Sequence, residues 1–263
     1  MRAKQILAFF LITYCTISTF AANDIYFSRI GVEQGLSQLS VMSIYQDEIG
    51  TMWFGTREGI NRYNGNSMEV IQQIQNDKNS LDGIQIQNIC GNKNGLVYIQ
   101  TENGLNQYDL RTCKISRINS KVNAISYGIR NLWIAEGNKL YAFEKNKKTF
   151  YCELPEKNEI ISAIIQTDNQ RIILGTKYST GVYIIDQNKK MHLAIKGCSE
   201  VSSIFEDNKS NIWIGTWQNG LYKIGRNGKI SNYIPSIKNI NSISSSFVRA
   251  ICEDNNGFLW IGT

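Results

Sequence analysis

The 263-residue chain carries 28 basic and 22 acidic residues, a net charge of +6. The charges are dispersed, and the densest group, Lys145, Lys147 and Lys148, fits a solvated loop better than a nucleic-acid-binding surface. This segment is therefore expected to contact no nucleic acid.

Residues 1–22 have the pattern of a secretory signal. Arg2 and Lys4 precede an uncharged apolar stretch, and small residues lie around Ala21. The apolar stretch is short for a membrane span. We therefore expect export, with a signal that is either cleaved or kept as an anchor.

From Val41 onward the sequence repeats. The clearest copy, Val201–Lys223, reads as three short strands separated by two polar turns, which is a β-meander. In six copies the aligned position in the second strand recurs at spacings of 35 to 47 residues. The aligned residues are Trp53, Tyr98, Trp133, Ile173, Trp213 and Trp260. A period near forty, with about four strands per unit and no helical periodicity after residue 22, is typical of β-propeller blades.

The predicted fold is therefore all-β, with four-stranded antiparallel blades in one domain over residues 23–263. The blades are expected at residues 41–74, 86–118, 122–151, 161–195 and 201–233, with a partial blade at 248–263. About five and a half blades would form an incomplete ring. Before the first blade, Ile25–Ile30 alternates like a single strand, and we expect it to complete the last blade.

The repeated residues are expected to serve the fold. Because the tryptophans recur at one strand position, packing between blades explains them better than sugar stacking. The glycines and threonines that follow them are expected to relieve crowding between sheets. Asp47, Asp207 and Asp254 share one turn position, where a carboxylate caps local backbone amides. The only histidine, His192, is expected at the surface.

The turns between second and third strands predict a binding surface. These turns emerge on one face of a propeller and differ between blades, which suits binding on a rigid scaffold. Trp217 and Tyr178 are suited to stacking on a sugar ring, and other turn residues to bonding hydroxyl groups. The candidate ligand-binding residues are Arg57, Glu58, Glu102, Asn103, Lys177, Tyr178, Trp217 and Gln218.

Residues 35–65 closely resemble the opening of the two-component regulator propellers of Bacteroides-type hybrid sensor kinases. The matching features are the entry Gly35-Leu36-Ser37, the core of Asp47, Gly50, Trp53, Gly55 and Thr56, and the third strand Gly59–Tyr63. The spacers at 76–89 and 239–254 are similar to those of that family, so the resemblance covers nearly all of residues 23–263.

The resemblance implies a seven-bladed ring in a periplasmic sensor with two successive propellers, a β-sandwich, a membrane span, a histidine kinase, a receiver and a DNA-binding module. It also implies a glycan or oligosaccharide ligand and an output on carbohydrate-use genes. The implied partners are the second propeller and a homodimer partner in the full-length protein. The parent protein would be anchored in the inner membrane, and this segment would reach the membrane only through it.

Two other functions are weighed against sensing. One is an exported scaffold or interaction module, although the signature pairs of WD and kelch repeats are absent. The other is a propeller glycosidase. Sialidase repeats place glycine two and tryptophan five residues after the aspartate, whereas Asp47 precedes Gly50 by three and Trp53 by six. No non-repeating carboxylate pair suggests an acid and a nucleophile, so no catalytic residue, cofactor or metal is expected.

Overall fold

The computed structural model describes residues 26–263 except 119, 120, 179 and 199, and it divides into two units, Met1–Ile30 and Gly31–Thr263. In the first unit, residues 26–30 have no regular secondary structure, so the strand predicted over Ile25–Ile30 is wrong for these residues. Alternation gives a segment an apolar face, but a strand also needs a partner strand to satisfy its backbone groups. The predicted signal at residues 1–22 lies outside the described residues.

The second unit consists of antiparallel sheets that follow one another along the chain, after one short 3-10 turn, η1 (Val32–Gln34). The first sheet contains β1 (Val41–Gln46), β2 (Met52–Thr56), β3 (Gly59–Tyr63) and β4 (Met68–Ile71). The second contains β5 (Ile86–Gly91), β6 (Leu96–Thr101), β7 (Leu105–Asp109) and β8 (Lys114–Arg117). The third contains β9 (Ala124–Tyr127), β10 (Leu132–Glu136), β11 (Lys139–Glu144) and β12 (Lys147–Glu153).

The remaining sheets continue the pattern. The fourth contains β13 (Ile161–Gln166), β14 (Ile172–Thr176), β15 (Gly181–Ile185) and β16 (Met191–Lys196). The fifth contains β17 (Val201–Glu206), β18 (Ile212–Thr216), β19 (Leu221–Ile224) and β20 (Ile230–Tyr233). The sixth contains β21 (Ala250–Glu253) and β22 (Leu259–Gly262). Within the described residues, no helix is long and apolar enough to cross a membrane.

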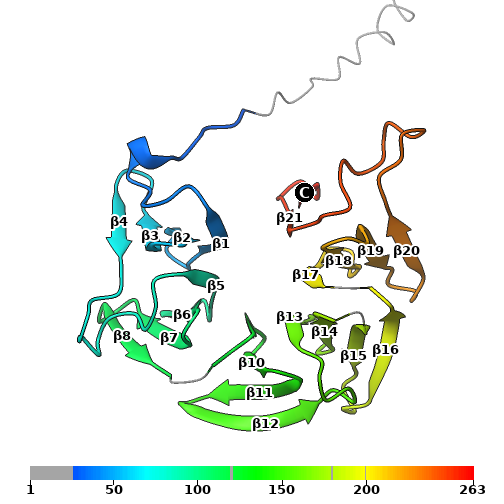
Figure 1. Cartoon of the computed structure of the whole chain (residues 1–263), viewed down its shortest axis with the longest axis horizontal. Helices are drawn as coiled ribbons and strands as arrows, with labels where there is room; N and C mark the ends of the chain where they lie inside the picture. The colour runs from blue at the N-terminus through cyan, green and yellow to red at the C-terminus, as the bar shows by residue number, and fades with distance from the viewer. Residues whose placement is uncertain (1–25, 119–120, 179, 199) are drawn as a thin grey trace, which may run out of the picture. The chain divides into compact units, whose positions relative to one another are not determined.

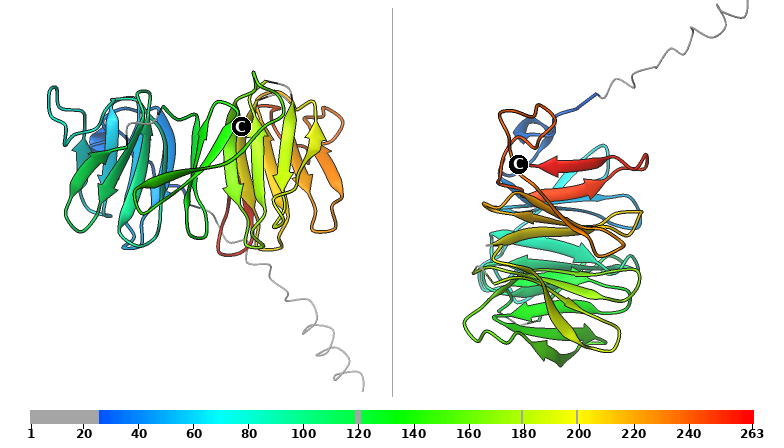
Figure 2. Two further views of the ribbon diagram at one scale, coloured as in Figure 1. Left: turned by 90° about the horizontal axis from the view of Figure 1, so that it is seen from below. Right: turned by 90° about the vertical axis from the view of Figure 1, so that its right-hand side faces the viewer.

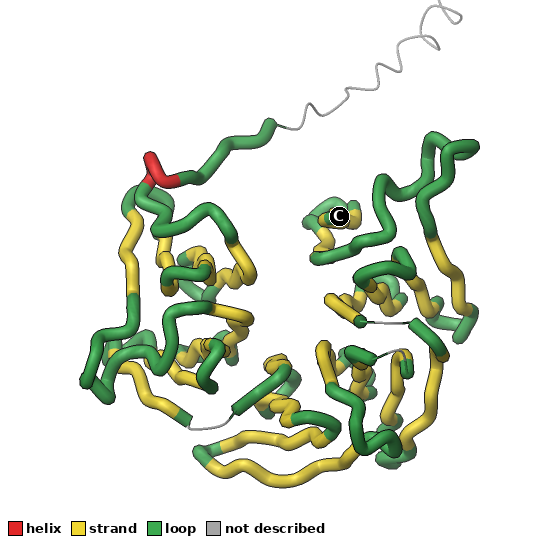
Figure 3. The backbone as a smooth tube through the Cα atoms, in the orientation of Figure 1, coloured by secondary structure: helices red, strands yellow, loops and turns green. Residues whose placement is uncertain are grey.

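These sheets are the blades of a propeller (Figure 1). In the first sheet β1 lies nearest the central axis and β4 lies at the rim, and the other full sheets repeat this order. Figure 2 shows the sheets edge on, with the connections gathered at the two ends of the strands. Figure 3 shows the ring open between the sixth sheet and the first. The predicted all-β propeller, with five full blades and a partial sixth, is confirmed.

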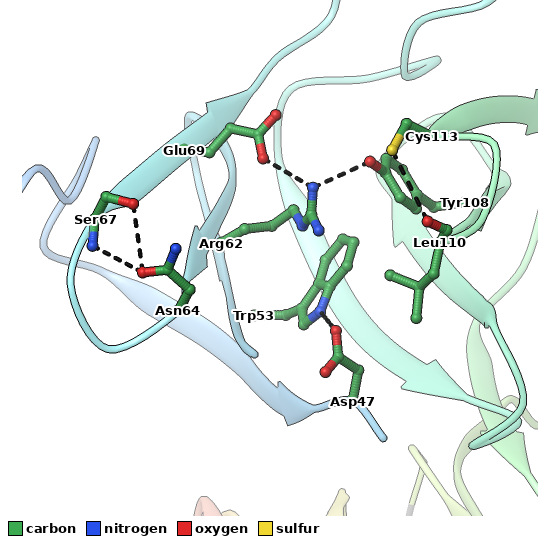
Figure 4. Close-up of polar contacts among 9 residues, drawn as sticks. All are labelled: Asp47, Trp53, Arg62, Asn64, Ser67, Glu69, Tyr108, Leu110 and Cys113. Atoms are coloured by element: carbon green, nitrogen blue, oxygen red, sulfur yellow. Dashed lines mark hydrogen bonds and ion pairs between the residues drawn. The ribbon is translucent and has the colours of Figure 1, made fainter. Parts of the chain in front are cut away.

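Two of the second-strand tryptophans, Trp53 and Trp133, pack between blades, as predicted. Trp53 and Trp133 are fully buried within apolar clusters. In Figure 4 the Arg62 guanidinium lies over the Trp53 ring, 4.8 Å from its centroid. One Nη of Arg62 donates a hydrogen bond to the Tyr108 hydroxyl of the second blade at 3.1 Å. The stacked Arg62 thus links this tryptophan to the second blade through its hydrogen bond to Tyr108.

The glycines after these aromatic positions let neighbouring blades approach closely. A Cβ atom added at Gly55 would lie 2.5 Å from a side-chain carbon of Ile86, and one at Gly175 would lie 2.3 Å from a side-chain carbon of Val201. Both separations are far shorter than the contact distance of packed carbon atoms. The predicted relief of crowding is therefore confirmed for these glycines.

The threonines after these glycines close the turn between the second and third strands, a role that the sequence did not predict. The Thr56 hydroxyl donates to the Gly59 carbonyl at 3.0 Å. Equivalent bonds run from Thr176 to Gly181 at 2.9 Å and from Thr216 to Gly220 at 2.8 Å. Strand alternation identifies a buried position, but it does not show that a buried hydroxyl must find a hydrogen-bond acceptor.

The repeated aspartates cap their turns, as predicted, and also bind the tryptophans. The Asp47 carboxylate accepts backbone N–H bonds from Thr51 at 2.8 Å and Ile49 at 3.2 Å, and an indole N–H bond from Trp53 at 2.9 Å. The indole bonds of the fifth and sixth blades join Trp213 to Asp207 at 2.8 Å and Trp260 to Asp254 at 2.9 Å. Each carboxylate therefore fixes its turn and the adjoining blade core together.

Burial acts to raise the pKa of the Asp207 carboxyl, but hydrogen bonds from the Trp213 indole and the Asn211 amide outweigh it. The pKa of Asp207 therefore lies below its ordinary value. A carboxyl with a lower pKa in the folded state stabilises the protein at neutral pH. That stabilisation is lost as the pH falls through the folded-state pKa.

The variant Asp207→Asn is expected to lower the free energy of unfolding at pH 7 by about 1–2 kcal/mol, because the amide replaces a charged acceptor of several hydrogen bonds. The difference from the wild type should shrink as the pH falls below the ordinary carboxyl pKa of about 4, since protonation then removes the charge in the wild type too. Urea unfolding over this pH range measures both effects. The exposed Asp168→Asn serves as control, and an equal loss in both variants would contradict the assignment.

The variant Gly175→Ala is expected to destabilise the chain by about 1–3 kcal/mol, because its methyl group would overlap Val201. The equivalent Gly262→Ala is the matched control, since an added Cβ there meets nothing closer than 3.6 Å. Its change should stay within about 0.5 kcal/mol. Denaturant unfolding of the two variants decides the matter, and similar stabilities would show that the close approach of the blades is unimportant.

Candidate functional site

A cavity of about 710 Å³ opens at one end of the central axis. Backbone hydrogen bonds place the turn from second to third strand beside the start of the next blade, as from Gly59 to the Ile84 carbonyl at 2.8 Å and from Glu200 to the Lys177 carbonyl at 3.1 Å. The cavity is accordingly lined by residues at the starts of the innermost strands and by the turn residues Glu102, Lys177 and Trp217. We call it the mouth cavity. Its walls come from all six repeats.

A repeated β-bulge shapes the wall of the mouth cavity. In four blades the pairing of the first and second strands shifts register directly after the first residue of the innermost strand, as between Val41 and Ser43. A bulge places one extra residue in the strand and re-aims its side chain. The bulge residues are Met42, Gln87, Ser162 and Ser202, and Asn123 and Arg249 hold the equivalent sequence positions in the other two repeats. All six line the mouth cavity and define what we call the bulge ring.

Several side chains of the bulge ring also bind the next blade. The Ser162 hydroxyl donates to the backbone carbonyl of Val201 at 2.7 Å, and the Ser202 hydroxyl donates to that of Val248. Each hydroxyl uses its one donor in this hydrogen bond, and its oxygen can still accept a hydrogen bond. The ring is therefore held in place by hydrogen bonds between blades.

The charged side chains of the mouth cavity differ in how they are bonded. The Glu102 carboxylate accepts N–H bonds from Ile84 at 3.1 Å and Gln85 at 2.8 Å, so its charge is already stabilised. Lys121, Lys177 and Arg249 supply positive charge, and Glu200 is the second acidic residue of the lining. In the described part of the chain, no carboxylate lies within ion-pair distance of these three cations.

Trp217 and Arg249 form a stacked pair at the cavity wall. The guanidinium carbon of Arg249 lies 3.7 Å from the centroid of the Trp217 ring, and Phe247 meets the same ring edge-on at 6.1 Å. A guanidinium stacked on indole keeps its N–H donors in its own plane, where they can meet an acceptor. On the face of the Trp217 ring that Arg249 covers, the pair therefore offers guanidinium N–H donors and not an open aromatic surface.

Of the eight predicted binding residues, Glu102, Lys177 and Trp217 lie together in the mouth cavity, and the other five do not line it. Arg57 and Glu58 are exposed in the β2–β3 turn. The Asn103 amide donates to the Asp82 carbonyl at 2.6 Å, which is a structural role. Tyr178 and Gln218 are exposed outside the cavity lining.

Sequence reasoning missed the bulge ring. Its signal is the position after each blade-opening aliphatic residue, where the repeats differ from one another. That variation resembles the variation of the turns, but period-two alternation assigns no special direction to one strand residue. The bulge that directs these side chains becomes visible only in the strand pairing.

In the described segments, no group of three or more His, Cys, Asp and Glu residues could hold a metal ion. His192 is exposed on β16, as predicted, and is not part of the cavity lining.

The basic group predicted as a solvated loop is exposed, but Lys147 and Lys148 belong to β12, so the loop assignment is wrong for them.

Three segments of the chain match the family model of the two component regulator propeller, namely residues 35–58, 196–218 and 242–263. A stretch of 82 residues is 34% identical to Histidine kinase P4 of Formosa agariphila and covers 31% of this chain and 6% of that protein. The resemblance recognised from the sequence motifs is confirmed.

Two solved structures illustrate the likeness of fold. The extracellular domain of a proposed hybrid two component system from B. thetaiotaomicron aligns with a TM-score of 0.56 and 22% identity, over 90% of this chain and 40% of that one. Virginiamycin B lyase from Staphylococcus aureus aligns with a TM-score of 0.66 and 16% identity, over 84% of this chain and 76% of the lyase. At these identities the likeness shows the fold alone. The chain spans less than half of the extracellular domain and a small part of the kinase.

Proposed function

The chain carries two-component regulator propeller repeats, and from this premise we propose that residues 23–263 form the exported ligand-sensing propeller of a hybrid two-component sensor. In this proposal the domain lies in the periplasm, senses a glycan or oligosaccharide, and regulates carbohydrate-use genes. Its partners are a second propeller and a homodimer partner in the full-length protein, which is anchored in the inner membrane. The segment itself catalyses no reaction and contacts no nucleic acid.

The observation that carries the proposal is the contrast between a uniform frame and a variable wall at the mouth cavity. The packed positions recur, with aspartate, tryptophan, glycine and threonine in the same places of several repeats. The bulge ring instead presents thioether, amide, hydroxyl and guanidinium groups at one equivalent position. Varied side chains on a rigid scaffold are typical of a binding site.

The chemistry of the wall supports a saccharide. Gln87, Asn123 and Ser202 provide amide and hydroxyl groups, which can exchange hydrogen bonds with sugar hydroxyls. Trp217 carries the Arg249 guanidinium against its ring, and the N–H donors of that guanidinium suit the oxygen atoms of a sugar. A cavity of about 710 Å³ lies in the range of small-molecule sites.

The expected mechanism is mechanical. A ligand can favour one of two arrangements of the subunits only if it binds one of them more tightly. A mouth cavity built from all six repeats can bind a ligand without deforming any one blade, because the blades are packed against one another. The ligand would then change the contacts of the propeller with the second propeller and with the homodimer partner.

A lyase function is less well supported. The likeness to virginiamycin B lyase lies in the fold, at 16% identity. The chain's only histidine is exposed on β16, outside the mouth cavity. The Glu102 carboxylate already accepts two backbone N–H bonds, which hold it in place at the cavity wall.

The full chain is expected to gain thermal stability from at least one of three oligosaccharides, xylotriose, maltotriose and trigalacturonate, because a ligand that binds only the folded state stabilises it. Trp217→Ala should weaken that binding at least tenfold. Differential scanning fluorimetry and isothermal titration calorimetry measure the two effects.

The exposed Phe258→Ala, in the β21–β22 turn, is the control and should bind within twofold of the wild type. If none of the three saccharides alters the melting temperature, or if Trp217→Ala binds as the wild type does, the proposed function is wrong.

A further inference from the structure

The charge of the mouth cavity points to the class of its ligand. Resting on the proposed function, we infer that the ligand is an acidic saccharide whose carboxylate or sulfate group is bound by Arg249. Lys121 and Lys177 supply further positive charge around the same cavity. The inference concerns charge, which the proposed function leaves open.

Arg249 is held in a geometry that suits an oxyanion. Its guanidinium lies against the Trp217 ring, 3.7 Å from the centroid, and this stacking restricts the plane in which the N–H groups point. Planar guanidinium groups bind carboxylate and sulfate oxygens through paired N–H bonds, which are stronger than neutral hydrogen bonds. The backbone of Arg249 is also fixed, since its N–H donates to the Gly262 carbonyl at 2.7 Å.

The balance of charge at the mouth cavity is positive. Three cationic side chains and two carboxylates line it. One of those carboxylates, on Glu102, already accepts two backbone N–H bonds. Gly83 makes room for this arrangement, because a Cβ atom there would lie 2.5 Å from a Glu102 oxygen. The acid that would otherwise offset a cation is thus turned toward the backbone.

None of the three cations is neutralised within the described residues, where no carboxylate lies within 4.0 Å of their side-chain nitrogens. Among the described residues, ion pairs are found for four basic side chains, Arg62, Arg111, Lys145 and Lys148, so what distinguishes the three cations is that they line one cavity together. A concave site with an excess of positive charge concentrates anionic ligands. An anionic group in the ligand would supply the missing partner.

The rest of the wall argues for a saccharide rather than a small inorganic anion. A cavity of about 710 Å³ is much larger than one sulfate ion, and amide and hydroxyl side chains line it beside the charged ones. Gln87, Asn123 and Ser202 lie in the bulge ring with Arg249. One end of the ligand therefore meets a cation while the remainder meets amide and hydroxyl groups.

The test measures binding to the full chain by isothermal titration calorimetry with matched pairs of probes. One pair is trigalacturonate and its methyl ester, which differ in carboxylate charge, and the other is a sulfated carrageenan disaccharide and its desulfated form. We expect at least one acidic probe to bind ten or more times tighter than its neutral counterpart. That preference should weaken as the salt concentration rises.

Variants locate the charge that matters. Arg249→Gln should weaken binding of the preferred acidic probe at least tenfold, and Arg249→Lys should restore only part of it, because lysine keeps the charge but lacks the planar fork. Arg226→Gln, exposed after β19 and outside the mouth cavity, is the control and should bind within twofold of the wild type. Unchanged melting temperatures would show that the variants fold.

The outcomes separate the inference from the proposed function. Equal or tighter binding of the neutral probes overturns the inference and leaves saccharide sensing standing. Acidic binding that survives Arg249→Gln unchanged also overturns it. If no saccharide binds, whether acidic or neutral, the inference and the proposed function both fail.

Discussion

The close contact between a second-strand glycine and the residue that opens the next blade sets the geometry of this molecule. Val201 packs where a side chain at Gly175 would otherwise stand, and Ile86 does the same at Gly55. The contact recurs in the first, fourth and fifth repeats, at Gly55, Gly175 and Gly215, and there it places each sheet against the next in the same way. Equal steps of this kind bring the innermost strands around a common axis.

The same contact explains why the mouth cavity lies where it does. The residue that packs on the glycine opens the innermost strand, and the bulge follows it at once. The frame residue and the wall residue are therefore neighbours in the chain, one turned into the blade interface and the other toward the axis. A substitution of the bulge residue can therefore change the cavity wall, while the strand-opening residue before it keeps the packing between blades unchanged. Neighbouring residues thus carry separate roles, one in the stability of the ring and the other in the selectivity of binding.

Much of this architecture could be predicted from the sequence, because the same residue types recur at the same positions of several repeats. Trp53, Gly55 and Asp47 were assigned structural roles from recurrence alone, and contacts in the structure confirm them. The site was harder to predict, since a turn such as Arg57–Glu58 and one such as Lys177–Tyr178 look alike in sequence but only Lys177 lines the cavity. The bulges that reveal this position in four other blades depend on pairing with a second strand, so Arg249 could not be singled out from the sequence.

The most direct test of this account is a crystal structure of the full chain soaked with trigalacturonate. The account predicts electron density for the saccharide within the mouth cavity, in contact with Arg249 and Trp217 and with members of the bulge ring. Density confined to the rim of the blades or to the opposite end of the axis would contradict it.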